Sequence, residues 1–381
     1  MLKKIAVITV IPAALMCCFY DAKAVDEKDI SAKAAIVYQP DTKQVLFCKN
    51  IHDRLPMAST TKIMSALLLS ENGQLDEPFT VDTEAIRTEG SSMGLTEGDI
   101  VTGRALMAGM LLPSGNDAAN ATAVYVSGSI PEFARLMNIR AAVIGMKDTH
   151  FVTPSGLHDD GHYSTAYDMA LLTAEALDDP VFAEICGSST VKTEFGDPPF
   201  SRYLKNTNKL LNMYEGCIGV KTGFTDEAGR CLVSACERDG IRLICVTLND
   251  RNDWNDHMAL YDAAYSEICP VPVDMGNLYV DVAGGISDRV AAVQSESVVY
   301  PSVSGNNPQI DCKVIVPQFV YAPVMTGDII GKMEFYAEGV KFSECDIVAS
   351  EDIGYLEGDK DKKEELSLID RITEFFKGLF T

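Results

Sequence analysis

The segment Ser59–Gly73 reads STTKIMSALLLSENG, a polar tetrapeptide followed by a run of apolar residues. The apolar run begins at Ile63, has the length of a helix and ends at Asn72-Gly73. Ser59 is therefore expected at or near the start of a helix. Residues three apart on a helix share a face, so the amine of Lys62 can reach the hydroxyl of Ser59.

This pairing suggests nucleophilic chemistry. A serine hydroxyl is a weak nucleophile unless a base lies beside it, and a lysine can be that base only when burial or a neighbouring cation lowers its pKa. The helix N-terminus would add partial positive charge where an oxyanion develops. The alternative is that Ser59 only caps the helix, which is a common role for serine before an apolar run.

Two further short motifs follow in the chain. Ser114-Gly115-Asn116 comes directly after Pro113, in a break between helical stretches where polar side chains can project into a cleft. Lys221-Thr222-Gly223 lies on a predicted strand, and Lys221 is a candidate for the cation that lowers the pKa of Lys62. Each motif alone could be an ordinary turn or strand end, but three motifs in this order are far more specific.

The segments around these motifs predict an α+β domain. Helical stretches run from Gly103 to about Leu177, with breaks at Pro113 and at 153–163. They lie between a predicted hairpin and a predicted antiparallel meander, whose strands are 34–38 and 44–48, then 218–224, 230–236 and 241–248. Helices placed between such strands are expected to pack on one antiparallel sheet.

The two ends of the chain carry different signals. Residues 1–24 are predicted to be a secretory signal, with an apolar run of about 15 residues before Ala22-Lys23-Ala24. An uncleaved anchor is the alternative, although a bilayer span needs roughly 20 apolar residues. The domain of residues 25–270 is followed by β-rich runs that predict a small all-β domain over 271–357. Residues 358–381 are predicted to form a charged linker and an amphipathic helix, and its apolar stripe favours the membrane interface over packing on the β domain.

Composition excludes several classes of function. The chain has 32 basic and 55 acidic residues and a net charge of -23, which argues against binding to nucleic acid. Its cysteines and five histidines show no zinc-ligand spacing, so no metal site is predicted, and the histidines are expected at the surface or in loops.

The stretches around the three motifs resemble the low-molecular-mass D-alanyl-D-alanine carboxypeptidases, which are penicillin-binding proteins. They are LPSGNDAA at 112–119, TPSGL at 153–157 and GVKTGFT at 219–225. The resemblance extends over the mature chain, including the β domain and the terminal helix. It implies a β-lactamase/transpeptidase-like fold for residues 25–270 and export to the outer face of the cytoplasmic membrane or the cell wall.

The resemblance also implies a role for each matching residue. Ser59 would attack the bond between the two terminal D-alanines of a peptidoglycan stem peptide, and β-lactams would acylate the same serine. Lys62 would take the proton and Ser114 would relay a proton to the leaving amine. The substrate would be bound by Asn116, Lys221, Thr222, Gly223 and Phe224, with the N–H groups of Ser59 and Phe224 as the oxyanion hole. No cofactor is implied.

Arg251, just after the last meander strand, is a candidate for further charge at the substrate carboxylate, or it simply faces solvent.

Two other functions share these motifs. A β-lactamase would need a dedicated glutamate to hydrolyse its acyl-enzyme, and no such motif stands between the second and third motifs. A catalytically weak protein that binds β-lactams or cell wall is the other alternative, and the presence of both Ser59 and Lys62 weighs against it.

Overall fold

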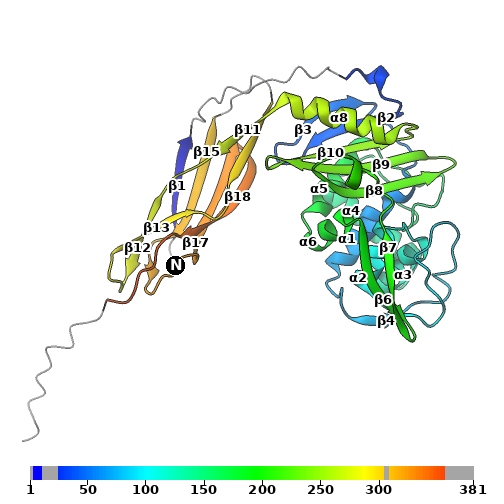
Figure 1. The fold of residues 1–381 in the computed structure, drawn as a ribbon, viewed down its shortest axis with the longest axis horizontal. Coiled ribbons are helices and arrows are strands. Elements are labelled where there is room, and N and C mark those ends of the chain that lie inside the picture. The colour runs from blue at the N-terminus through cyan, green and yellow to red at the C-terminus, as the bar shows by residue number, and fades with distance from the viewer. Residues whose placement is uncertain (1–2, 11–24, 304–308, 357–381) are drawn as a thin grey trace, which may run out of the picture. The chain divides into compact units, whose positions relative to one another are not determined.

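The computed structural model describes residues 3–10, 25–303 and 309–356 (Figure 1). The chain forms two compact units, and it passes from one to the other between Val271 and Pro272 and again between Val298 and Val299. The first, called the catalytic unit below, contains the three motifs. The second, called the β unit, consists of strands. Each unit is described by itself.

A five-stranded antiparallel sheet lies at the centre of the catalytic unit. Its strands follow the order β3-β2-β10-β9-β8. They are β2 (Ala34–Gln39), β3 (Gln44–Lys49), β8 (Cys217–Thr225), β9 (Gly229–Arg238) and β10 (Ile241–Leu248). The predicted hairpin and meander are therefore confirmed and join in one sheet, because β2 pairs with β10.

Both faces of this sheet are buried. Because successive side chains of a strand point to opposite faces, Ala35 and Val37 of β2 face helix α8 (Asp253–Glu267) on one side. Ala34 and Ile36 face the helical cluster on the other side. Figure 1 shows α8 on one face of the sheet and α5 on the opposite face. At the edge of this sheet, β8 is held by its antiparallel pairing with β9.

Helices form in the stretches where the sequence predicts them, and they pack into one cluster. It comprises the short 3₁₀ turn η2 (Ala58–Thr61) with α1 (Lys62–Glu71), then α2 (Gly103–Leu111), α3 (Asn116–Ser127), α4 (Ile130–Ile144), α5 (Ala166–Leu177) and α6 (Pro180–Gly187). Thr102, Ser129 and Thr165 cap α2, α4 and α5 by accepting backbone N–H groups. The predicted breaks at Pro113 and at 153–163 are loops.

Smaller elements complete the catalytic unit. They are the hairpins β4 (Pro78–Thr80) with β5 (Ile100–Thr102) and β6 (Thr190–Gly196) with β7 (Pro199–Lys205), the short helix α7 (Leu210–Met213), and the turn η1 (Glu27–Asp29). The expectation that the histidines lie at the surface or in loops is wrong for His257, which is buried within α8. His162 is in a loop, as expected, but it is also buried.

The β unit is a seven-stranded sheet with the order β1-β15-β17-β18-β13-β12-β16. The strands are β1 (Lys3–Val10), β12 (Leu278–Ala283), β13 (Arg289–Gln294), β15 (Ile310–Pro317), β16 (Val320–Tyr321), β17 (Ile329–Ala337) and β18 (Val340–Ala349). The strands β11 (Ile268–Val273) and β14 (Val298–Val303) form a separate pair, and most of both strands belongs to the catalytic unit. The prediction of a β-rich second domain is confirmed.

The predictions for the two chain ends have different outcomes. Lys3–Val10 of the predicted signal segment forms β1, antiparallel to β15. The cleavage site after Ala24 and the predicted terminal helix lie outside the described residues, so both stay predictions. In the ranges that the structure describes, no helix combines the length and apolar character needed to cross a bilayer.

Candidate active site

The η2 turn presents Ser59 at the start of α1. Ala58, just before it, has a φ of 48°, in the left-handed region that non-glycine residues seldom adopt. The hydroxyls of Thr60 and Thr61 donate to the carbonyls of Met57 and Ala58 at 2.7 and 2.8 Å. These bonds hold the turn in shape, and Lys62 Nζ then lies 2.8 Å from Ser59 Oγ.

Lys62 is fully buried and has three polar neighbours. Besides Ser59 Oγ, its Nζ donates to Asn116 Oδ1 at 2.7 Å and to the Ser155 carbonyl at 2.6 Å. Burial, and then the charge of Lys221, lower its pKa well below the ordinary lysine value. The neutral amine has two N–H donors for the two carbonyl oxygens, so its lone pair faces the Ser59 hydroxyl and can accept that proton.

The third motif brings a second buried lysine to the site. Burial lowers the pKa of Lys221 to about 7, and its Nζ donates to the Thr222 carbonyl at 2.8 Å. Gly223 lets β8 approach the η2 turn closely, because a Cβ there would lie 3.1 Å from both Met57 O and Ser59 N. This close approach places β8 directly beside the turn that carries Ser59.

The second motif enters from the loop between α2 and α3. Ser114 has a φ of 66°, and the following residue anchors the loop through Gly115 N–H, which donates to Gly109 O at 2.8 Å. Asn116 begins α3, and its Nδ2 donates to the Glu89 carbonyl at 2.7 Å, which orients its Oδ1 toward Lys62. The first and second motifs are thus bonded directly through Lys62 and Asn116.

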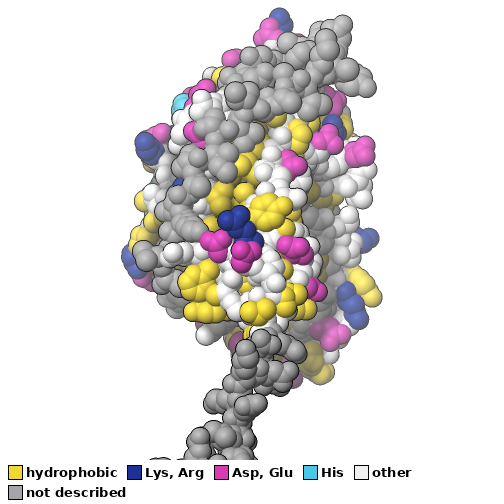
Figure 2. All heavy atoms as spheres, turned by 90° about the vertical axis from the view of Figure 1, so that its left-hand side faces the viewer, with side chains coloured by type: hydrophobic (Ala, Val, Ile, Leu, Met, Phe, Trp, Pro, Cys, Tyr) yellow, Lys and Arg dark blue, Asp and Glu magenta, His cyan; other side chains and the backbone are white. Residues whose placement is uncertain are grey.

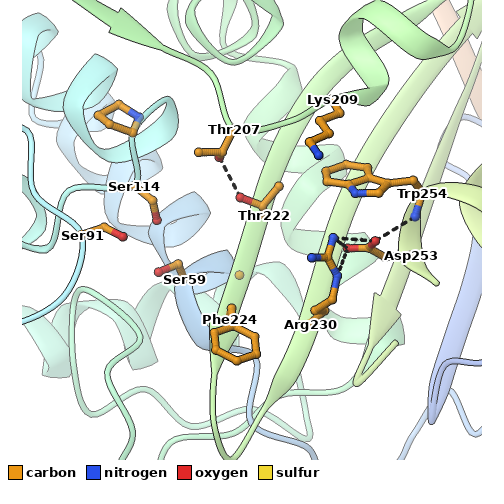
Figure 3. A pocket seen from close by; sticks show the side chains of 12 residues that line it. Ser59, Ser91, Ser114, Thr207, Lys209, Thr222, Phe224, Arg230, Asp253 and Trp254 are labelled. Carbon is orange, nitrogen blue, oxygen red and sulfur yellow. Dashed lines mark hydrogen bonds and ion pairs between the residues drawn. The ribbon is translucent and has the colours of Figure 1, made fainter. Parts of the chain in front are cut away.

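These elements enclose a cleft of about 350 Å³, shown in Figure 3. It is lined by Ser59, Ser91, Pro113, Ser114, Thr207, Lys209, Thr222, Gly223, Phe224, Arg230, Asp253 and Trp254. Ser59 and Ser114 lie on one side in Figure 3, and Thr222 and Phe224 on the other. The hydroxyls of Thr207 and Thr222 lie 2.8 Å apart. Lys62 and Lys221 are buried beneath this surface.

Two cationic side chains, Lys209 and Arg230, line the cleft, and neither is the arginine proposed from the sequence. Arg251 is exposed in the turn before α8 and is not among the lining residues, whereas Arg230 is. Arg230 on β9 pairs in register with Phe224 and binds both carboxylate oxygens of buried Asp253 at 2.7 Å. Cross-strand partners share a face of the sheet, so the tight turn between the third motif and Arg230 was the signal that could have identified this residue.

The described residues 3–10, 25–303 and 309–356 contain no group of three His, Cys, Asp or Glu side chains that could hold a metal ion.

Comparisons with known proteins find relatives for both units. A family profile described as D-alanyl-D-alanine carboxypeptidase matches residues 21–252, and one described as the C-terminal domain of penicillin-binding protein 5 matches residues 273–355. The chain is 33% identical to the D-alanyl-D-alanine carboxypeptidase DacF of Bacillus subtilis over 350 residues, which cover 87% of this chain and 88% of the relative. It is 30% identical to the Escherichia coli carboxypeptidase DacC, covering 88% and 87% of the two chains.

Solved structures are also similar to this chain. The Streptomyces K15 DD-transpeptidase aligns over its full length with 64% of this chain, at a TM-score of 0.60 and 29% identity. Penicillin binding protein 5 from Haemophilus influenzae covers 87% of this chain with all of its own, at a TM-score of 0.61 and 23% identity, and so supports the two-domain fold alone.

Proposed function

This chain belongs to the family of serine-type D-alanyl-D-alanine carboxypeptidases, and from that membership we propose a role for each residue of the cleft. The activity itself is D-Ala-D-Ala carboxypeptidase activity, and the chain is a low-molecular-mass penicillin-binding protein. Family membership implies peptidoglycan peptides as substrates and β-lactams as ligands. The assignment of individual residues below is our proposal.

Ser59 is the nucleophile and Lys62 is its base. The Ser59 Oγ attacks the carbonyl carbon between the two terminal D-alanines, while its proton passes to the neutral Nζ of Lys62, 2.8 Å away. Ser114 relays a proton to the departing amine, the peptide bond breaks and the last D-alanine leaves. Water then attacks the ester, which returns Ser59 to its hydroxyl form and releases the shortened peptide.

The remaining residues of the motifs bind and polarise the substrate. Asn116 holds both Lys62 and the substrate backbone, and Lys221 lowers the pKa of Lys62. The backbone N–H groups of Ser59 and Phe224 receive the oxyanion, which the close approach of Gly223 to the η2 turn supports. Thr222 and Gly223 line the cleft where the substrate carboxylate would lie.

We assign the cation for that carboxylate to Arg230 instead of Arg251. Arg230 lines the cleft beside Thr222 and Phe224, and its side chain keeps 44% of its surface exposed although it is paired with Asp253. Asp253 fixes the guanidinium in one orientation while leaving donors free for a second carboxylate.

One observation carries the residue assignment: a buried lysine of lowered pKa points its nitrogen at the hydroxyl of an accessible serine in a cleft. The direct test is incubation of the mature protein with a stem pentapeptide, followed by mass spectrometry. Loss of one D-alanine by the wild type and none by a Ser59→Ala variant is the expected result. Release of D-alanine by Ser59→Ala would refute the assignment.

We further propose that the protein acts at the outer face of the cytoplasmic membrane, where its substrate lies, and that its C-terminal segment binds the membrane surface. Members of the family are proteins of the cell envelope, which agrees with this location.

The end of the β unit supports the membrane contact. Backbone bonds join Leu356 to Gly284 and Ile286 to Gly354, so these two segments meet where the described chain ends. Exposed apolar side chains gather on these segments and their neighbours: Ile286, Tyr321, Met325, Ile329, Tyr355 and Leu356. Figure 2 shows hydrophobic patches among charged side chains on one face of the molecule. Such a surface suits the membrane interface, where tyrosine and aliphatic side chains are favoured.

A further inference from the structure

His162 lies beneath the η2 turn, the nucleophile turn that carries Ser59. Its ring makes hydrogen bonds in two directions. Its Nε2 is 2.8 Å from the hydroxyl of Thr61, within the first motif. Its Nδ1 accepts the backbone N–H of Val152 at 2.9 Å and lies 3.3 Å from that of Thr153. The ring therefore bridges the nucleophile turn and the start of the loop 153–163.

These bonds fix the tautomer of the ring. Because Nδ1 accepts N–H groups, it carries no proton, and Nε2 must carry the proton and donate to Thr61 Oγ1. The Thr61 hydroxyl donates in turn to the carbonyl of Ala58, the residue of positive φ just before Ser59. A directed chain of hydrogen bonds thus runs from the loop backbone through His162 and Thr61 to the peptide that precedes the nucleophile.

The same loop holds the base. The Ser155 carbonyl accepts from Lys62 Nζ at 2.6 Å, and the Pro154 carbonyl accepts from the Ser65 hydroxyl at 2.6 Å. Gly156 packs against the η2 turn so closely that a Cβ there would lie 2.0 Å from Ala58 O. Any shift of this loop relative to the turn would therefore change the distance between Lys62 and Ser59.

We infer that His162 is a positioning residue for acylation: its neutral ring locks the 153–163 loop to the η2 turn and so sets Ser59 and Lys62 at their reacting distance. This role rests on the proposed assignment of Ser59 and Lys62, and extends it to a residue that does not line the cleft. His162 does not line the cleft, and it acts through Thr61 and through the backbone of Val152 and Thr153.

The environment of the ring keeps it neutral. His162 is buried, and burial lowers its pKa to about 4, against the opposing charge of Asp159 and with His150 and His158 acting in the same direction as burial. Phe151 packs edge-on against the ring with its centroid 5.8 Å away. A protonated Nδ1 would turn a donor toward the Val152 N–H and break the bridge.

The bridge has two arms, which are the hydrogen bond from Nε2 to Thr61 and the hydrogen bond from Val152 N–H to Nδ1. Three substitutions separate them. His162→Phe fills the space and removes both arms. His162→Gln places an amide N–H near the Nε2 position and keeps the donor to Thr61, and His162→Asn places an oxygen near the Nδ1 position and keeps only the acceptor for Val152. His257→Phe is the matched control, because His257 is equally buried and bridges two hydroxyls, Ser234 and Thr247, at 2.7 and 3.0 Å, without contact to the nucleophile turn.

The measurement is the acylation rate constant with a chromogenic β-lactam, resolved into the binding constant and the chemical step, on the full mature chain. Because the observed rate constant refers only to molecules that react, partial misfolding does not lower it. We expect His162→Phe and His162→Asn to slow the chemical step about tenfold, the effect of losing one well-placed hydrogen bond, with binding nearly unchanged. His162→Gln, which keeps the bond to Thr61 but loses the acceptor for Val152, should also slow the chemical step, because the bridge needs both hydrogen bonds.

The control and a second variant give the inference its test. His257→Phe should lower the melting temperature and leave the chemical step unchanged. Thr61→Val should slow the chemical step, and its combination with His162→Phe should add little, because both act through one bond. A wild-type chemical step in His162→Phe, His162→Gln or His162→Asn overturns the inference. If Ser59→Ala is still acylated, the proposed nucleophile is wrong, and that result is separate from the outcome for His162.

Discussion

The buried Lys221 side chain on β8 lowers the pKa of Lys62 on α1, and this effect adds to that of burial. Burial is the larger cause for Lys62, and Asp117 opposes it only as the last contribution. The Lys62 amine therefore loses its proton far more readily than an ordinary lysine side chain. An activated serine hydroxyl follows from that arrangement.

Labelled penicillin should acylate Ser59, because the carbonyl of a β-lactam presents the same target as the terminal D-alanine bond. Peptide mapping of the labelled protein by mass spectrometry checks this. Label on the peptide that contains Ser59, and its loss in Ser59→Ala, is the expected outcome. Label on any other residue of the folded protein would contradict the mechanism.

Lys62→Ala should retain the fold and lose acylation at neutral pH by a factor of order 100 or more, the scale of a lost general base. The stopped-flow rate of acylation measures this loss, and circular dichroism checks the fold. Lys147→Ala, a change at an exposed lysine, is the matched control and should react like the wild type. Undiminished acylation of Lys62→Ala would move the base role to another residue.

Replacing Lys221 should shift the acid limb of the pH profile. The acylation rate falls as pH drops because Lys62 becomes protonated, and the charge of Lys221 keeps the Lys62 pKa low. Lys221→Met removes that charge, so the Lys62 pKa rises and the rate should begin to fall at a higher pH than in the wild type. The shape of the acylation profile between about pH 4 and 8 tests this, whatever the absolute rate. A limb that stays in place would show that burial alone sets the Lys62 pKa.

Arg230→Ala should raise the KM for a stem pentapeptide about tenfold or more, because a charge-assisted hydrogen bond to the carboxylate is lost. Steady-state release of D-alanine provides the measurement. Arg251→Ala is the control and should leave KM unchanged, since Arg251 does not line the cleft. The reverse pattern would restore the role expected for Arg251 from the sequence.

Truncation after Gly358 should release the protein from lipid vesicles while hydrolysis of a soluble pentapeptide stays nearly unchanged. The removed segment carries the apolar stripe predicted to lie in the interface. Sedimentation with vesicles and thermal melting of both forms check this. Failure of the mature full-length chain to sediment, or unfolding of the β unit on truncation, would mean that the segment packs on the protein.

Much of the fold could be predicted because its signals are local. Turn residues and β-prone runs indicated the hairpin of β2 and β3 and the meander of β8 to β10, and the apolar run after Lys62 indicated α1. The motifs with Ser59, Ser114 and Lys221 could be picked out because each keeps its chemistry within three or four consecutive residues. A resemblance to a known family then tied them to one activity.

Contacts between distant segments were decided only by the tertiary structure. Arg230 and Arg251 look alike in the sequence, but the antiparallel register beside Phe224 brings one into the cleft, while the turn before α8 leaves the other in solvent. His162 is one polar residue in a glycine-rich loop until that loop folds against Thr61. Sequence determined which side chains are able to do the chemistry, whereas burial and strand pairing determined their distances and pKa values, because these depend on neighbours far away in the chain.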